Sequence, residues 1–234
     1  MKIPQHHDNA MAFVQLSLMT HPRHLVVFDL DGTLTSGDSY LAYLIGFVVR
    51  HPSRLVRLLH LPWPLLRFSM GLIDNVSLKR HFLRACLGGI HCLELQRWTQ
   101  TFLDRLVSQG LSRDGLVALE RHRRDGDMLI LLSASFDFYV EELGRRLRFD
   151  HVLCTKAAWN GDYLSGDLAG PNRYGLEKLR CLAEMKTQVG EMPVIAYADH
   201  ESDIPFLQFV DKGMLINGTA NARRIAERRG IPCS

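Results

Sequence analysis

Three short apolar runs along the chain are each followed by a polar residue that can take part in chemistry. LVVF is followed by Asp29, MLILL by Ser133 and VIAYA by Asp199. Uninterrupted apolar runs of this length are typical of strands buried on both faces, as in a parallel sheet covered by helices. Helical periodicity and turn signals fill the segments between the runs, so the pattern predicts an α/β fold with a parallel sheet.

The positions of these polar residues predict where a site lies. Ligands of open α/β sheets bind in the crevice at the carboxyl ends of the strands. We therefore expect Asp29, Ser133 and Asp199 to meet in one crevice, although they are far apart in the sequence.

The segment over residues 36–125 has helical patterns and no convincing strand. Apolar residues recur at helical spacing in three stretches, over residues 41–48, 78–86 and 93–106. We interpret the whole segment as a helical cap, inserted after the first strand and lying over the crevice.

The remaining chain divides around this insertion. Residues 25–35 and 126–234 would form the catalytic core, and residues 1–24 an N-terminal extension. Asn160-Gly161, in the stretch AAWNGDYLSGD, predicts a tight β-hairpin over residues 157–167.

Composition narrows the class of protein. The 234 residues are 47% hydrophobic and 23% charged, which is ordinary for a soluble globular protein of one or two domains. The net charge of +3 gives no reason to expect a nucleic-acid partner. The five cysteines are scattered, without a C-x-x-C pair, as expected for reduced thiols in the cytoplasm. We find neither a signal-peptide cleavage pattern nor an apolar run of roughly 18 residues that could span a bilayer.

The first polar cluster reads DLDGT and places two carboxylates two residues apart. Crowded carboxylates repel each other and lose hydration, so the pair indicates a cation or a reaction that uses both groups. A calcium loop would need Gly at its sixth and Glu at its twelfth position, whereas Gly32 is fourth and Tyr40 twelfth. A phosphate-binding G-x-x-x-x-G-K-[ST] loop does not occur. On spacing alone, a turn capped by acidic residues remains the alternative.

The other polar residues complete a phosphoryl-transfer site. A carboxylate can attack phosphorus and form an aspartyl phosphate, but both partners are anions. Magnesium held by Asp29 and Asp199, together with the ammonium of Lys178 at a predicted helix start, would supply the positive charge.

Two further tasks remain in such a site. A second carboxylate must protonate the leaving oxygen and then activate water, and Asp31 is placed for that. Ser133, Thr33 and the turn around Gly32 could hold the phosphoryl oxygens.

These motifs together resemble the haloacid dehalogenase superfamily of phosphohydrolases. The resemblance rests on DLDGT, on Ser133 in LLSAS, on Lys178 in GLEKL, and on Asp199 and Asp203 in YADHESDIP, in that order. The long helical insertion after the first motif is similar to the phosphoserine-phosphatase-like branch. The stretch WNGDYLSGDLAGPNRYGLEK looks most like the phosphatidylglycerophosphatase C-like group.

The resemblance implies a magnesium-dependent phosphatase that works through an aspartyl phosphate. It implies Asp29 as the nucleophile and Asp31 as the general acid and base. It implies phosphoryl binding by Thr33, Ser133, Ala134 and Lys178, with fixing of the Asp31 side chain as the alternative for Thr33. It also implies magnesium binding by Asp29, the main-chain carbonyl of Asp31 and Asp199, and orientation of Lys178 or a metal-bound water by Asp203.

Several positions depart from the pattern of phosphoserine phosphatases. Asp38 stands where they carry a Glu that reads the substrate amine, and Ala134-Ser135 stands where they carry Gly-Gly. Ala198, His200 and Glu201 make the last motif more crowded than usual. These changes leave the chemistry intact and argue against specificity for phosphoserine.

One stretch of the cap predicts a membrane contact. Residues 39–73 contain no acidic residue but four arginines, and Trp63 lies between Pro62 and Pro64, where a helix should break. We expect Arg50, Arg54 and Arg57 to share one helical face. Such a basic amphipathic helix fits an anionic surface at the inner face of the membrane. Packing of its apolar face within the cap is the alternative.

The substrate is therefore expected to be a phosphate ester, with two alternatives for its class. A membrane contact would favour a phospholipid phosphate such as phosphatidylglycerophosphate, whereas a small soluble ester such as phosphoserine is the other candidate. A catalytically silent binding module is the non-enzymatic alternative, but every catalytic position holds a competent residue type.

Overall fold

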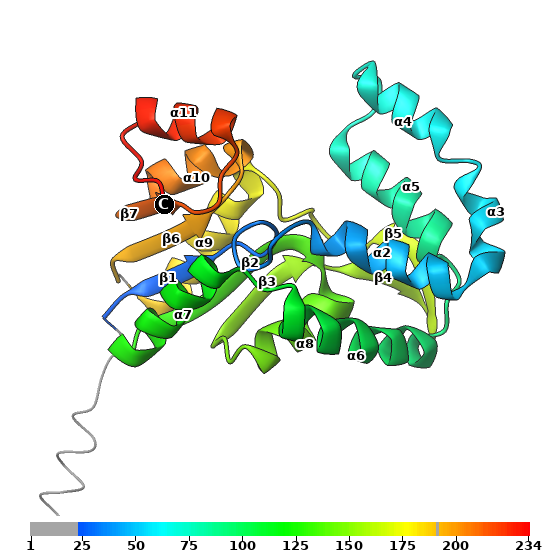
Figure 1. Ribbon diagram of the computed structural model, residues 1–234, viewed down its shortest axis with the longest axis horizontal. Helices are drawn as coiled ribbons and strands as arrows, with labels where there is room; N and C mark the ends of the chain where they lie inside the picture. Colours follow the sequence, from blue (N-terminus) through cyan, green and yellow to red (C-terminus); the bar gives the residue numbers. More distant parts are fainter. Residues whose placement is uncertain (1–22, 191) are drawn as a thin grey trace, which may run out of the picture.

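A five-stranded parallel sheet forms the centre of the molecule, as the apolar runs predict (Figure 1). The computed structural model describes residues 23–190 and 192–234, so almost all of the predicted N-terminal extension lies outside the described residues. The strand order is β3-β2-β1-β6-β7, with every neighbouring pair parallel. The strands are β1 (Leu25–Phe28), β2 (Met128–Phe136), β3 (His151–Thr155), β6 (Val194–Ala198) and β7 (Lys212–Leu215).

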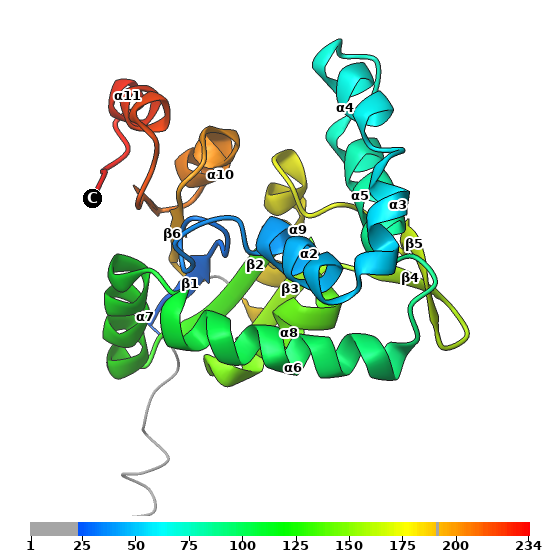
Figure 2. The same ribbon diagram turned by 45° about the vertical axis from the view of Figure 1, so that its right-hand side comes forward.

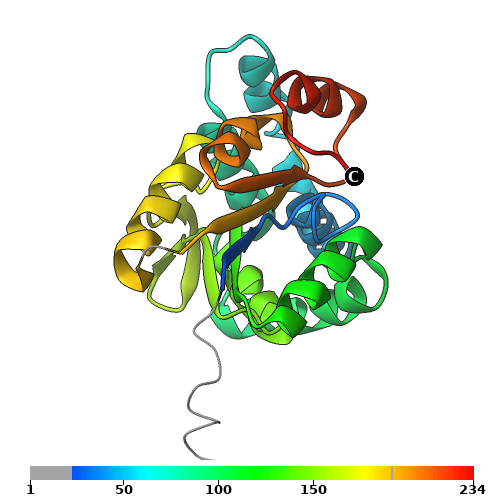
Figure 3. The same ribbon diagram turned by 90° about the vertical axis from the view of Figure 1, so that its left-hand side faces the viewer.

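Helices cover both faces of this sheet (Figure 3). Alternate residues of β1 pack into two separate apolar clusters, Val26 and Phe28 into one and Leu25 and Val27 into the other. The first cluster includes side chains of α6 (Cys92–Gln109), α7 (Arg113–Asp125) and α8 (Asp137–Arg146). The second includes side chains of α9 (Leu176–Val189), α10 (Ile204–Phe209) and α11 (Ala220–Arg228).

The cap projects from one end of the sheet and is built from two distant segments (Figures 1 and 2). Its helical part contains α2 (Ser39–Arg50), η1 (Pro52–Arg54), α3 (Leu55–Leu58), α4 (Pro62–Ser69) and α5 (Asn75–Leu87). The second part is the predicted hairpin, which is confirmed as β4 (Ala157–Asn160) and β5 (Tyr163–Leu168). The two parts are joined where Gly89 N donates to Leu164 O at 2.7 Å and Arg80 pairs with Asp167 at 2.6 Å.

The helix α7 falls within residues 36–125, the segment expected to form the cap, but it packs on the sheet. Gly115, in the first turn of α7, is so close to the main chain after β1 that a Cβ there would lie 2.4 Å from Thr33 O. Farther along α7, His122 Nε2 lies 2.8 Å from the hydroxyl of Tyr197 in β6. This helix therefore covers the sheet and not the crevice.

The expected continuous helix through Arg50, Arg54 and Arg57 is wrong. The helix α2 ends at Arg50 and the chain turns at His51, because the next residue is Pro52, which disfavours helical backbone in the residue before it. The expected break at Pro62 and Pro64 is confirmed, since α3 ends at Leu58 and a separate helix, α4, begins at Pro62 and contains both prolines in its first turn. A proline lacks only a donor that has no helical acceptor in that turn.

No helix of the described residues combines the length and the apolar composition that crossing a bilayer requires.

Candidate active site

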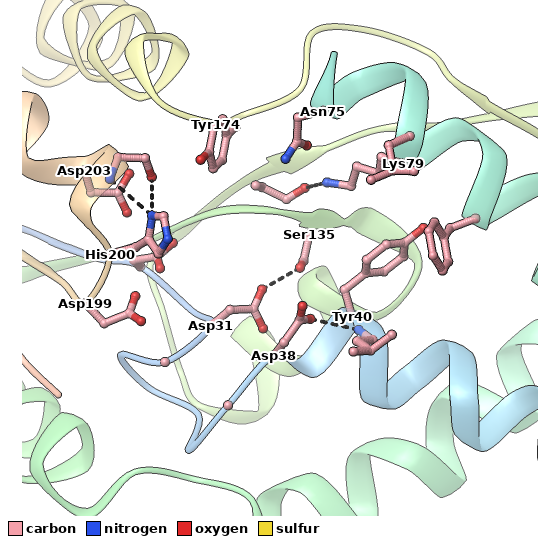
Figure 4. A pocket seen from close by; sticks show the side chains of 18 of the residues that line it. Asp31, Asp38, Tyr40, Asn75, Lys79, Ser135, Tyr174, Asp199, His200 and Asp203 are labelled. Atoms are coloured by element: carbon pink, nitrogen blue, oxygen red, sulfur yellow. Dashed lines mark hydrogen bonds between the residues drawn. The ribbon is translucent and has the colours of Figure 1, made fainter. Parts of the chain in front are cut away.

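A cavity of about 520 Å³ lies between the carboxyl ends of the strands and the cap (Figure 4). Six predicted site residues line it: Asp29, Asp31, Ala134, Lys178, Asp199 and Asp203. The sheet brings them together from β1, β2, α9 and the loop after β6, as the positions at the strand ends predict.

The turn after β1 places the first two carboxylates. Asp29 N donates to Tyr197 O at 2.9 Å, which extends the pairing of β1 with β6 by one residue. Gly32 follows in the left-handed region, at φ 76°. A Cβ at this position would lie 2.0 Å from Oδ2 of Asp199, so glycine allows the turn to pass against that carboxylate.

Lys178 is buried in the floor of the site. Its Nζ donates to Asp29 Oδ1 at 2.8 Å and to Asp203 Oδ2 at 2.6 Å. Burial lowers the pKa of Lys178, but the two carboxylates outweigh burial, so the pKa is raised and the side chain is a cation. Lys178 thus joins the carboxylates of Asp29 and Asp203.

Asp31 is held by two serines, one from the cap and one from the core. Its Oδ1 accepts from the main-chain N and the Oγ of Ser39, the first residue of α2, and its Oδ2 accepts from Ser135 Oγ at 2.6 Å (Figure 4). Ser39 Oγ in turn lies 3.0 Å from the hydroxyl of Tyr139. Burial raises the pKa of Asp31, against the effect of the hydrogen bonds from Ser135 and Ser39. A raised pKa suits a carboxyl that must carry a proton before donating it.

The remaining carboxylates fit a divalent cation. Burial raises the pKa of Asp199 to about 6, with a further increase from Asp203. Burial also raises the pKa of Asp29, even though Lys178 lowers it. Asp203 Oδ1 is buried without a hydrogen-bond partner among the described residues. One ammonium therefore faces several carboxylates, and oxygen ligands of this kind are those that Mg²⁺ prefers.

A different acidic group lies away from this cavity. His122, Asp125 and Asp127 have potential ligand atoms within 4.8 Å of one another. However, His122 already uses Nδ1 toward Asp127, at 2.7 Å, and Nε2 toward Tyr197. We assign this cluster to the packing of α7 on the sheet.

Two predicted phosphate-binding hydroxyls lie behind the cavity lining. Ser133 is fully buried, and its Oγ accepts from Ser135 N at 3.0 Å. Thr33 is also fully buried, and its Oγ1 donates to Asp199 Oδ1 at 3.5 Å. In this conformation Thr33 therefore contacts the carboxylate proposed for metal binding.

The cap contributes an apolar wall and a half-buried lysine, Lys79, which was not predicted from the sequence. Leu41, Leu44, Leu78 and Phe82 line the cavity on the cap side. Beside them, Lys79 Nζ in α5 donates to Asn172 Oδ1 at 3.0 Å and to the carbonyl of Ala134. Burial lowers the pKa of Lys79 to about 8. Lys79 directly follows Leu78, within an apolar helical repeat, and this position was the sequence signal that could have indicated it.

Asp38 has a local structural role at the mouth of the cavity. Its Oδ1 accepts from Leu41 N at 2.8 Å and caps the first turn of α2 (Figure 4). Caps of this kind contribute about 1 kcal/mol to helix stability. The carboxylate that would have to read a substrate amine is thus already engaged at one oxygen.

Comparison with known proteins agrees with this geometry. Residues 26–208 match the model of the haloacid dehalogenase-like hydrolase family. The chain is 24% identical over 208 residues to the phosphoserine phosphatase SerB1 of Mycobacterium tuberculosis, covering 87% of this chain and 68% of that protein.

Solved structures share the fold. A protein of unknown function from Bordetella pertussis Tohama I superposes with a TM-score of 0.77 at 22% identity, covering 91% of this chain and 98% of that one. A phospho-aspartyl intermediate analogue of phosphoserine phosphatase gives 0.63 at 14% identity, covering 91% and 93%. Because the family model spans most of the sequence, including every motif of the cavity, this chain belongs to the haloacid dehalogenase-like hydrolase family and is an enzyme.

Proposed function

We propose that this hydrolase is a magnesium-dependent phosphatase that cleaves a phosphate monoester through an aspartyl phosphate on Asp29. One observation carries the proposal: Lys178, a buried cation, joins Asp29 to Asp203 in a cavity that also contains Asp31 and Asp199. The Asp29 and Asp199 carboxylates and the main-chain carbonyl of Asp31 would hold Mg²⁺, whose charge would offset that of the phosphate and the carboxylates.

The side chains divide the reaction into two steps. In the first, an Asp29 oxygen bonds to phosphorus, the bond from phosphorus to the leaving oxygen breaks, and Asp31 gives that oxygen its proton. In the second, Asp31 takes a proton from water, the water oxygen bonds to phosphorus, and the Asp29 carboxylate leaves. Lys178 keeps Asp29 oriented and stabilises negative charge on the phosphoryl oxygens throughout.

The cap side of the cavity favours a phospholipid phosphate as substrate. Its wall is apolar, and Lys79 provides a cation there besides Lys178 at the floor. An ester such as phosphatidylglycerophosphate would place its monoester at Asp29, its phosphodiester near Lys79, and apolar chains toward the wall. The engagement of Asp38 as a helix cap also disfavours an amine-bearing substrate.

A small soluble ester such as phosphoserine is the second candidate. The names of one relative, SerB1, and of two solved structures of phosphoserine phosphatase with this fold favour it.

A comparison of kcat/KM for phosphatidylglycerophosphate in mixed micelles, phosphoserine and a generic aryl phosphate separates the two candidate substrates. We expect the lipid ester to be preferred, EDTA to stop all turnover, and Mg²⁺ but not Ca²⁺ to restore it. Full activity in excess EDTA would contradict the mechanism, and a preference for phosphoserine would contradict the lipid substrate.

Lys79 allows a sharper test of the substrate class. In Lys79→Met we expect kcat/KM for the lipid ester to fall by roughly tenfold or more, the effect of losing one charge-assisted contact. The aryl phosphate has no second anion, so its kcat/KM should fall much less. Arg80→Met on the same helix is the control, because Arg80 pairs with Asp167 outside the cavity. Equal losses for both substrates would mean that Lys79 does not read the leaving group.

A further inference from the structure

The cap exposes an unusual concentration of apolar side chains. Among the described residues, twenty large apolar side chains are exposed, and twelve of them lie between Leu41 and Leu72. We refer to these twelve as the cap surface. Single exposed apolar residues are normal, but a group of this kind marks an interaction site.

The cap surface is continuous with the mouth of the active site. Leu41, Ile45 and Val49 follow one another at i, i+4 and i+8 along α2, opposite the buried Tyr43 and Phe47. Leu41 also lines the cavity, so this row of side chains begins at the active site and leads along α2 toward α3. The helices α3 and α4 then form the part of the cap farthest from the sheet, where a large flat partner can reach them (Figures 1 and 2).

The charge of the same segment selects the partner. No Asp or Glu occurs between Ser39 and Ile73, where Arg50, Arg54, Arg57 and Arg67 occur. Within residues 23–190 and 192–234, none of these four arginines forms an ion pair with a carboxylate. Arg54 and Arg57 both donate to the carbonyl of Gly88, at 2.8 Å, which holds two cations side by side. Their charge remains available to an anionic surface.

Element length and side-chain type indicate how the cap meets that surface. The helices α2 and α4 have 12 and 8 residues, too short to cross a hydrocarbon core that needs about 20. Trp63, 64% exposed in the first turn of α4, is the side chain that prefers the boundary between headgroups and acyl chains. Short helices with apolar and basic residues bind in the plane of an interface.

We propose that the cap surface docks this enzyme on a bilayer that contains anionic lipid. Docking places the mouth of the cavity, at Leu41, beside the headgroups, so a lipid phosphate can enter while its acyl chains stay in the bilayer. Entry of a lipid phosphate rests on the proposed lipid substrate, whereas docking on the bilayer does not.

Flotation of the full chain with vesicles tests docking directly. We expect it to float with vesicles of phosphatidylcholine and phosphatidylglycerol, much less with phosphatidylcholine alone, and less at high salt, which screens the arginines. The double variant Leu59→Ser/Trp63→Ser removes two apolar contacts at 76% and 64% exposure. Its vesicle affinity should fall by roughly ten- to a hundredfold.

A matched control separates the cap surface from general hydrophobicity. Val117→Ser/Phe209→Ser removes side chains of similar exposure, 62% and 60%, from α7 and α10. We expect it to bind vesicles like the unmodified protein, and both double variants should keep the melting temperature and aryl phosphatase activity.

Three results would overturn the proposal. One is the absence of vesicle binding, and another is an equal loss in the two double variants. The third is a dimer in analytical ultracentrifugation that Leu59→Ser/Trp63→Ser dissociates, because the cap surface would then bind a second copy of the chain. Docking without hydrolysis of phosphatidylglycerophosphate would contradict the proposed substrate and leave the docking proposal standing.

Discussion

Asp31 accepts hydrogen bonds from Ser39 in the cap and Ser135 in the core. The carboxyl that we propose as acid and base is therefore oriented from both sides of the cavity. Ser135 occupies one of the two positions where phosphoserine phosphatases were expected to carry glycine, so its hydroxyl is an addition to the site. We infer that Ser135 positions Asp31 for proton transfer.

We predict that Ser135→Ala lowers kcat about tenfold or more with little change in KM. The hydroxyl donates to Asp31, the proposed acid and base, and one hydrogen bond to a charged group is worth about 1.5–3 kcal/mol. Steady-state kinetics on an aryl phosphate gives both constants. Ser165→Ala is the control, because among the described residues that hydroxyl bonds only to Ala158 O and Asp167 N in the hairpin region. An unchanged kcat in Ser135→Ala would remove the positioning role.

At the scale of elements, the hairpin β4–β5 and the helix α5 form one unit of the cap. Gly166 in β5 has a φ of 83°, and a Cβ there would lie 2.8 Å from the Cα of Arg84 in α5. The main chains of the two elements therefore approach more closely than any side chain at this position would allow.

We predict that Gly166→Ala destabilises the protein by clearly more than Gly161→Ala. Both glycines have positive φ, which costs an alanine about 1–2 kcal/mol, but no atom of residues 23–190 and 192–234 lies within 4 Å of a Cβ at Gly161. The difference between the two free energies of unfolding in urea therefore isolates the contact with α5. Equal losses would mean that the hairpin does not pack against α5 in solution.

The sequence predicted elements with a strong local signal. The apolar runs of β1, β2 and β6, the three helical repeats and the Asn160-Gly161 turn are all confirmed. The sheet's edge strands, β3 and β7, escaped prediction because HVLCT and KGML are partly exposed and lack an uninterrupted apolar run. The helix break at His51 was missed because the repeat outweighed the signal of Pro52.

The site was predictable to the same extent. Motif residues at strand ends meet because the sheet topology brings them together, and six of them line one cavity. Ser39 and Lys79 were missed because their roles depend on how the cap folds back over the sheet, which no local pattern encodes. Arg50, Arg54 and Arg57 do not form the expected basic face of one helix. Arg54 and Arg57 donate to the carbonyl of Gly88, and Arg50 lies over the ring of Trp98.

At the scale of the whole molecule, a buried polar network ties the sheet to α7. Asp127, just before β2, accepts from His122 in α7 at 2.7 Å and from His24, just before β1, at 2.9 Å. His122 also contacts the hydroxyl of Tyr197 in β6. Four segments of the core therefore depend on one buried carboxylate.

This network predicts a pH dependence of stability. Burial raises the pKa of Asp127, but the hydrogen bonds from His122 and His24 outweigh burial, so the pKa is lowered. A lowered pKa stabilises the fold above the unfolded value, about 3.9, and that stability is lost as the pH falls through the folded value. We expect Asp127→Asn to be less stable at pH 7, with the difference shrinking below about pH 4. Urea unfolding across this range measures it, with the exposed Asp104→Asn as control. A difference that is constant with pH would contradict the assignment.

Trapping the intermediate shows whether Asp29 becomes phosphorylated during turnover. The enzyme is mixed with aryl phosphate and Mg²⁺, quenched in acid, which preserves acyl phosphates, and analysed by intact and peptide mass spectrometry. We expect one added phosphoryl group on the peptide that contains Asp29, and neither adduct nor turnover in the nearly isosteric Asp29→Asn. A phosphoryl group on another residue, or turnover retained in Asp29→Asn, would contradict the proposed mechanism.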